Sequence, residues 1–249
     1  MARRSLRSGR HETPKAVSAR SETFDALDTE FEDLLQRMQT PAARKGMEMA
    51  FNAALGRAAT KTERRLIRAV LWQRVQGTGL ERFELLQDPD GWVLRGAILA
   101  LEKQGPAQAN YEILCDAAWH TLRAVVSLRD GIHDRSLALT VEDGRWVENG
   151  NERPAVRGCI DIDLGWSPST NTLPIRRLGL AVGQKSGIIT AAWVRFPELT
   201  LEPLPQEYER LAERRYRYSS RGGAFTAELE IDEDGLVVDY QGIWRRVSG

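Results

Sequence analysis

The sequence contains little cysteine and little histidine. Its 249 residues include two cysteines, Cys115 and Cys159, and three histidines. The basic N-terminus has no apolar run behind it, so it does not match a secretory signal. We therefore expect a cytoplasmic protein in which both thiols stay reduced. The three histidines, His11, His120 and His133, follow no zinc-binding spacing, and we expect no metal site and no cofactor.

The sequence also lacks net charge and long apolar runs. Lysine plus arginine and aspartate plus glutamate each total 35, so no global field attracts nucleic acid or an anionic membrane. No apolar run approaches the roughly 18 residues that a transmembrane helix needs. With 42% hydrophobic and 28% charged residues, the composition is that of a globular protein. We expect neither a nucleic-acid partner nor stable membrane insertion.

Common catalytic signatures are missing as well. The chain has no Gly-x-Ser-x-Gly motif, no phosphate-binding loop and no dinucleotide-binding fingerprint. Cys115 and His120 could suggest a thiol–imidazole pair, but on one strand they would face opposite sides, so a buried, inert cysteine is the better interpretation. The sequence therefore assigns no catalytic residue and favours binding over catalysis.

The N-terminal quarter differs in character from the rest. Residues 1–20 carry six basic residues and one glutamate with almost nothing large and apolar, which predicts a disordered tail. Residues 21–60 are predicted to form a helical extension, because apolar side chains recur there at steps of three and four. The first stripe consists of Phe24, Leu27, Phe31, Leu34 and Met38. A second stripe runs from Met47 to Leu55, so we expect a helical hairpin whose stripes need a partner.

Residues 61–249 are predicted to form a mainly β domain. Apolar and polar residues alternate in segments such as 137–141 and 225–231, which is typical of strands. Asp-Gly pairs at 90–91, 143–144 and 234–235 separate such segments, and this dipeptide favours tight hairpin turns. The pattern predicts a long antiparallel meander, hence a strongly curved sheet or open β-barrel.

Two of the predicted strands are apolar on both faces. In one, Trp92, Leu94, Ile98 and Ala100 lie opposite Val93, Ala97, Leu99 and Leu101. In the other, Trp119 and Val125 lie opposite Leu122, Ala124, Val126 and Leu128. Because an antiparallel sheet usually has one wet face, something is expected to cover the second one: a helix, a second protomer or a ligand.

The segment 159–180, CIDIDLGWSPSTNTLPIRRLGL, contains the polar side chains best suited to form a binding or catalytic site. Asp161 and Asp163 stand at strand spacing, which directs both carboxylates to one face of a sheet. Together with Asp116 they could hold a hard cation. The alternative, which we favour because buried charges need partners, is a polar network in which the aspartates pair with arginines. The candidate arginines are Arg123, Arg176 and Arg177.

This segment and four others resemble the putative glycolipid-binding protein family, over about residues 71–249. The other four segments are CDAAWHTLR (115–123), AAWVRFP (191–197), YERLAERRYRY (208–218) and AELEIDEDGLVVDYQGIWRR (227–246). Family motif residues correspond to Asp161, Asp163, Thr170, Asn171, Pro174, Ile175, Arg176 and Arg177. Gln241 departs from the proline expected before Gly242. The resemblance implies a lipoprotein-carrier-like open barrel with a helical element across its mouth.

Three functions follow from these observations. The first is non-catalytic binding of a lipid or glycolipid-like amphiphile in the concave face of the sheet. Its candidate ligand-binding residues are Trp119, Arg123, Asp161, Asp163, Asn171, Arg176 and Arg177. The second is a hydrolase or transferase that uses the Asp161/Asp163 pair, which a strongly shifted carboxylate pKa beside an open pocket would favour. The third is an interaction scaffold that accepts a protein segment or the chain's own helical hairpin.

Overall fold

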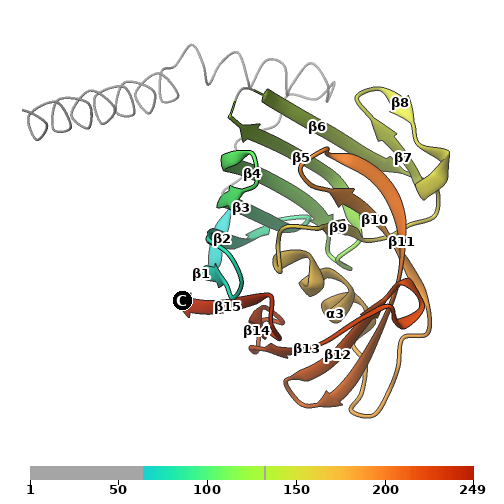
Figure 1. Cartoon of the computed structure of the whole chain (residues 1–249). Helices are drawn as coiled ribbons and strands as arrows, with labels where there is room; N and C mark the ends of the chain where they lie inside the picture. Colours follow the sequence, from blue (N-terminus) through green and yellow to red (C-terminus); the bar gives the residue numbers. More distant parts are fainter. Residues whose placement is uncertain (1–63, 132) are drawn as a thin grey trace, which may run out of the picture. The chain divides into compact units, whose positions relative to one another are not determined.

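A computed structural model describes residues 64–131 and 133–249, which lie in the unit Thr62–Gly249. These residues form one curved sheet of 15 strands in the order β8-β7-β6-β5-β4-β3-β2-β1-β15-β14-β13-β12-β11-β10-β9 (Figure 1). Neighbouring strands pair antiparallel, except β9 and β10, which pair in parallel. The end strands β8 and β9 do not pair, so the sheet stays open. The expected curved antiparallel sheet is confirmed, whereas the predictions for residues 1–20 and 21–60 lie outside the described residues.

Two meanders make up the sheet. The first comprises β1 (Arg65–Arg74), β2 (Gly79–Asp88), β3 (Gly91–Glu102), β4 (Gly105–Asp116), β5 (Thr121–Asp130), β6 (His133–Glu142), β7 (Arg145–Glu148) and β8 (Asn151–Glu152). The second comprises β10 (Ile189–Arg195), β11 (Thr200–Ala212), β12 (Arg215–Ser220), β13 (Phe225–Ile231), β14 (Val237–Tyr240) and β15 (Trp244–Ser248), and β9 (Ile162–Leu164) pairs in parallel with β10 at its edge. Pairing of β1 with β15 joins the two meanders into one sheet.

The short connections follow from local sequence. At the turn between β6 and β7, Asp143 and Gly144 have φ angles of 51° and 71°, and a two-residue hairpin turn of this twist requires positive φ at both positions. Gly91 opens β3 where an added Cβ would lie 2.1 Å from the carbonyl oxygen of Cys115. The Asp-Gly pairs therefore stand at hairpin turns, as the sequence predicts.

One short helix lies inside the curve of the sheet. The helix α3 (Thr172–Leu178) follows the 3-10 turn η2 (Ser169–Asn171), and further 3-10 turns are η1 (Pro154–Val156) and η3 (Arg221–Gly223). Leu173 and Ile175 of α3 are buried in the core. The helix ends at Gly179, whose left-handed backbone (φ 54°) lets its N–H bond the Ile175 carbonyl. Packed in this way, α3 covers the inner face of the strands around it.

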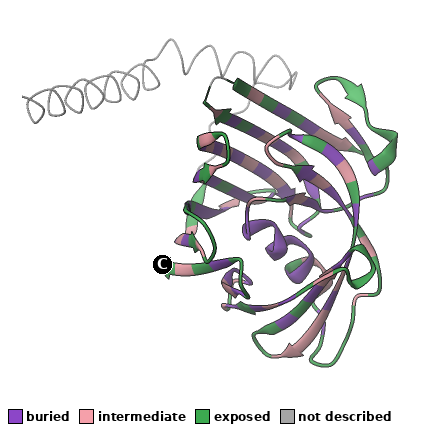
Figure 2. Cartoon of the chain, in the orientation of Figure 1, coloured by how far each residue is buried: buried purple, intermediate pink, exposed green. Residues whose placement is uncertain are grey.

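Burial alternates along the strands, with the inner face forming the core (Figure 2). In β4 the odd-numbered residues from Ala107 to Cys115 are all buried, while their even-numbered neighbours are partly exposed. The outer face of β3 behaves differently, because Leu99 and Leu101 are 58% and 57% exposed. Whether a helix, a second protomer or a ligand covers those leucines stays a prediction.

The structure corrects the interpretation of the segment around Trp119. This residue and His120 do not belong to a strand but to the turn between β4 and β5. Asp116 organises the turn, because its carboxylate accepts hydrogen bonds from the backbone N–H groups of Ala118 and His120 and contacts the His120 imidazole. A side-chain acceptor of this kind stabilises a tight turn and competes with strand geometry.

Candidate functional site

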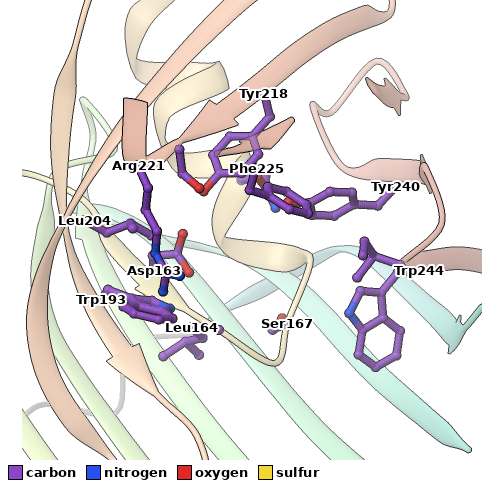
Figure 3. Close-up of a pocket in the computed structure, with 14 residues that line it drawn as sticks. Asp163, Leu164, Ser167, Trp193, Leu204, Tyr218, Arg221, Phe225, Tyr240 and Trp244 are labelled. Atoms are coloured by element: carbon purple, nitrogen blue, oxygen red, sulfur yellow. The ribbon is translucent and has the colours of Figure 1, made fainter. Parts of the chain in front are cut away.

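A cavity of about 300 Å³ opens between the start of α3, β9–β11 and β12–β15 (Figure 3). Its wall is predominantly aromatic and aliphatic, with a few polar groups. The lining residues are Asp163, Leu164, Gly165, Ser167, Asn171, Trp193, Leu204, Tyr218, Ser220, Arg221, Phe225, Tyr240, Ile243 and Trp244. We call this space the aromatic cavity. A largely apolar wall with few convergent polar groups is the usual composition of a small-molecule site.

Asp163 supplies the carboxylate of the aromatic cavity. It lies on β9, and the Gln206 side chain of β11 donates a hydrogen bond of 2.5 Å to it. Burial raises the pKa of Asp163 to about 6, the Gln206 hydrogen bond opposes this rise, and the charge of Asp161 adds to it. Asp163 therefore changes its charge close to neutral pH, and it does so at the cavity wall.

Aromatic rings from three strands form one side of the cavity. Tyr218, Phe225 and Tyr240 contact each other edge to face, with ring centres between 5.9 and 6.3 Å apart. On the other side, the Arg221 guanidinium lies 4.9 Å from the centre of the Trp193 ring, which is a cation–π arrangement. Figure 3 shows Arg221 extending to the Trp193 ring, on the same side of the cavity as Asp163. The cavity thus combines ring faces with one cation and one carboxylate.

Behind Ser167 lies a buried polar cluster that the sequence analysis missed. The carboxylate of Glu81 on β2 is fully buried and accepts hydrogen bonds from Tyr111 (2.5 Å) and Ser167 (2.7 Å). Ser169 joins through its hydroxyl, 2.7 Å from both Tyr111 and Ser167. We call these four residues the Glu81 cluster.

Burial dominates the chemistry of the Glu81 cluster. It raises the pKa of Glu81 to about 8, against the hydrogen bonds from Tyr111 and Ser167 and the charge of Arg74. One carboxylate oxygen, Oε2, is buried and has no hydrogen-bond partner among the described residues. A neutral acid tolerates such an oxygen better than a carboxylate does, so Glu81 carries a proton at neutral pH.

A local signal could have revealed this cluster. Glu81 stands at strand spacing before Phe83 and Leu85, so a carboxyl occupies the apolar face of β2. The second signal is Gly96 of β3, which lies opposite Tyr111 of β4. A Cβ there would lie 2.4 Å from the Tyr111 ring. The glycine therefore makes room for the tyrosine that reaches Glu81.

The predicted aspartate–arginine pairing is found at one of the two aspartates. Asp161 is 2% exposed, and Arg177 of α3 binds it with two hydrogen bonds of 3.0 and 2.5 Å. Asp163 has Gln206 as its hydrogen-bond partner instead of an arginine. Within residues 64–249, apart from 132, no three His, Cys, Asp or Glu side chains are placed to hold a metal ion. Asp161 and Arg177 thus neutralise each other beneath α3.

The remaining candidates lie apart from the aromatic cavity, except Asn171. The amide oxygen of Asn171 accepts a hydrogen bond of 2.9 Å from Tyr208 at the cavity wall. Trp119 and Arg176 line a second cavity, which shares no lining residue with the first. Arg123 pairs in register with Leu114 on the face of β5 that points away from the core, near Glu112. The seven candidates therefore do not form one site.

Trp119 has an unusual backbone conformation. Its φ angle is 70°, and a bulky residue in the left-handed region costs on the order of 1–3 kcal/mol. The conformation places its ring on that of Trp92, with centres 4.6 Å apart and an interplanar angle of 14°. Arg176 covers the Trp119 ring at 5.2 Å. The three side chains form a stacked column at the wall of the second cavity.

Comparison with known proteins supports the resemblance stated above. The model of a protein family described as putative glycolipid-binding matches residues 69–246. The chain belongs to this family. A crystal structure of a DUF1089 family protein from Pseudomonas aeruginosa is similar at 35% sequence identity and a TM-score of 0.63, and the match covers 77% of this chain and 100% of that one. No curated protein sequence matches the chain.

The description of the family names a ligand class, glycolipids, but it does not say which residues bind the ligand or whether a reaction follows. A fold can host unrelated functions, so the function has to be argued from the site. In the described part of the chain, no helix is long and apolar enough to cross a membrane. The aromatic cavity and the second cavity are therefore the places where the family description can be tested.

Proposed function

We propose that this protein binds a glycolipid-like amphiphile without transforming it, and that the aromatic cavity holds its polar head group. The observation that carries the proposal is the composition of the wall, where the rings of Trp193, Tyr218 and Phe225 line the same cavity as Asp163 and Asn171. A sugar ring offers apolar C–H faces to aromatic rings and hydroxyl groups to carboxylate and amide oxygens. The family description, putative glycolipid-binding, supports the same ligand class.

The size of the aromatic cavity limits what enters it. About 300 Å³ is at the lower end of small-molecule sites, which span roughly 300–1,000 Å³. One ring or a short alkyl segment fits this volume, whereas a whole lipid does not. Each methylene removed from water contributes about 0.8 kcal/mol, so an alkyl chain against the neighbouring apolar surface adds affinity to the head-group contacts.

Octyl glucoside, kept below its micellar concentration, is a suitable probe for this proposal. Native mass spectrometry should show one adduct for the full chain, and isothermal titration calorimetry should give a saturable isotherm. Phe225→Trp enlarges a side chain of the cavity wall and should abolish binding. Phe196→Trp is the matched control, because Phe196 stacks on Trp166 at 4.8 Å and does not line the cavity. Absence of binding, or equal loss in both variants, would refute the proposal.

The pKa of Asp163 supports a second candidate, a hydrolase acting on the same ligand class. A carboxyl group with a pKa of about 6 at an open cavity is suited to general acid–base catalysis near neutral pH. Asp161 is occupied by Arg177, so Asp163 would have to act without it. Release of p-nitrophenol from p-nitrophenyl glycosides, lost in Asp163→Asn and retained in Phe196→Trp, would establish the hydrolase; octyl glucoside recovered intact supports binding alone.

A further inference from the structure

The second cavity, of about 390 Å³, lies at the C-terminal end of α3 and is lined by three arginines. Arg176 comes from α3, Arg210 from the end of β11 and Arg214 from the turn that follows β11. Trp119 and Tyr216 supply ring faces beside them. We infer that this arginine cavity binds an oxyanion of the phosphate type, independently of the aromatic cavity.

The partners of Arg176 and Arg210 are neutral. Arg176 Nη1 lies 3.5 Å from the Glu233 carbonyl oxygen, and its guanidinium covers the Trp119 ring. Arg210 donates to the carbonyl oxygens of Leu180 (2.7 Å) and Glu213 (2.6 Å). Arg210 Nε is buried without a hydrogen-bond partner in the described part of the chain. Among the described residues, neither guanidinium is therefore paired with a carboxylate.

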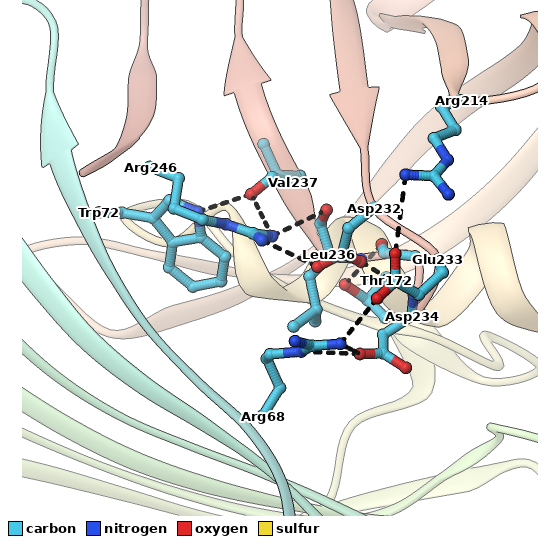
Figure 4. A network of polar contacts seen from close by, with 11 residues as sticks. Arg68, Trp72, Thr172, Arg214, Asp232, Glu233, Asp234, Leu236, Val237 and Arg246 are labelled. Carbon is cyan, nitrogen blue, oxygen red and sulfur yellow. Dashed lines mark hydrogen bonds and ion pairs between the residues drawn. The ribbon is translucent and has the colours of Figure 1, made fainter. Parts of the chain in front are cut away.

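Two of the three carboxylates of the same wall, Asp232 and Glu233, have partners (Figure 4). Asp232 accepts a hydrogen bond of 2.8 Å from Arg246 and two more from the backbone N–H groups of residues 234 and 236. Glu233 pairs with Arg68 at 2.9 Å and with Arg214 at 3.6 Å. The formal charges of the residues that line the arginine cavity sum to zero, because three carboxylates and three arginines line it. Because neither Asp232 nor Glu233 pairs with Arg176 or Arg210, the charge of these two arginines remains available to a ligand.

The position of Arg176 is set by its surroundings. Its stem passes over Gly235, where an added Cβ would lie 2.9 Å from Arg176 Cδ. The guanidinium carbon lies 5.2 Å from the centre of the Trp119 ring. A planar guanidinium held in this way presents a fork of donors that matches phosphate oxygens, which a flexible lysine would not. The arrangement therefore favours a phosphate group over an uncharged ligand.

Isothermal titration calorimetry of the full chain at low ionic strength tests this inference, with inorganic phosphate and dihexanoylphosphatidylglycerol as separate probes. Arg176→Gln should raise the Kd by about tenfold or more, because it removes a charge-assisted contact. It leaves the fold intact, since Arg176 is exposed and makes a single 3.5 Å hydrogen bond. Glu213→Gln should lower the Kd, because it removes a carboxylate from the rim of the cavity.

Arg195→Gln is the matched control. Arg195 is exposed and also covers a tryptophan, 5.3 Å from the centre of the Trp193 ring, but it lines neither cavity. Its removal should leave the Kd of both probes unchanged. Similar affinity for both probes identifies the phosphate group as the ligand, and much tighter binding of the lipid adds a role for the acyl chains. No binding of either probe, an unchanged Kd in Arg176→Gln, or an equal loss in Arg195→Gln would overturn the inference.

Discussion

Replacement of Glu81 by glutamine should change how stability depends on pH. The folded protein holds a proton on Glu81 up to a pKa of about 8, whereas the ordinary value is 4.5. Between these two pH values the unfolded chain releases the proton and the folded chain keeps it, so stability falls as pH rises. This contribution is fully present below pH 4.5 and is lost as the pH passes through the folded-state pKa.

The structure sets the size of the effect. At about 1.4 kcal/mol for each pH unit between the two pKa values, the free energy of unfolding should fall by about 5 kcal/mol. That is a large part of the roughly 5–15 kcal/mol that stabilises a typical domain. Glu81→Gln removes the titration, but it places an amide group at the buried, unpartnered Oε2 position, which costs about 1–3 kcal/mol.

Denaturant unfolding at a series of pH values between 5 and 9 measures both effects. The variant should be less stable than the natural protein at the acidic end and more stable at the alkaline end, so the two curves cross. Glu84→Gln is the control on the same strand: burial raises the pKa of Glu84, but hydrogen bonds from Arg95 and Arg82 outweigh burial and lower it. The free energy of unfolding of Glu84→Gln should therefore depart from that of the natural protein in its pH dependence at acid pH. Parallel curves for Glu81→Gln and the natural protein would refute the reasoning.

Three further perturbations test the architecture. Asp161→Asn should reduce the free energy of unfolding by about 3–5 kcal/mol, because it leaves the largely buried Arg177 guanidinium unpaired; unchanged thermal stability would contradict a structural role. Gly96→Ala should cost about 1–3 kcal/mol, since its Cβ would lie 2.4 Å from the Tyr111 ring, and equal denaturation midpoints would show that the ring moves freely. A chain reduced to residues 60–249 should have nearly the same melting temperature as the full chain. If the shortened chain unfolds instead, the N-terminal segment is required for folding.

Regular features of the fold were predictable because they depend on neighbours in sequence. Alternation along β13 and the Asp143-Gly144 turn are local signals, and both describe the structure correctly. The pairing of Asp161 with Arg177 was predictable as one of several options, because buried charges need partners. Which arginine pairs with Asp161 depends on where α3 lies, and a seven-residue helix is too short to show a helical period.

Two features escaped prediction, one that depends on the curvature of the sheet and one that is local. Glu81 and Ser167 are 86 residues apart, and they meet because the chain returns inside the curve between β9 and α3. Trp119 was assigned to a strand, since its neighbours have strand composition, but the carboxylate of Asp116 turns the chain there. The contact between Glu81 and Ser167 is set by tertiary packing, whereas the turn at Asp116 is a local motif that competes with strand geometry.

Ser167 belongs both to the aromatic cavity and to the Glu81 cluster, two features that the sequence alone did not connect. Its hydroxyl lines the aromatic cavity and donates to Glu81. A ligand group that accepts a hydrogen bond from Ser167 would therefore compete with the Glu81 carboxyl for the same proton. Because that hydrogen bond lowers the pKa of Glu81, its loss would raise the pKa further and favour the protonated acid. Binding of such a ligand would therefore be thermodynamically linked to proton uptake at Glu81, although the Glu81 side chain itself is buried.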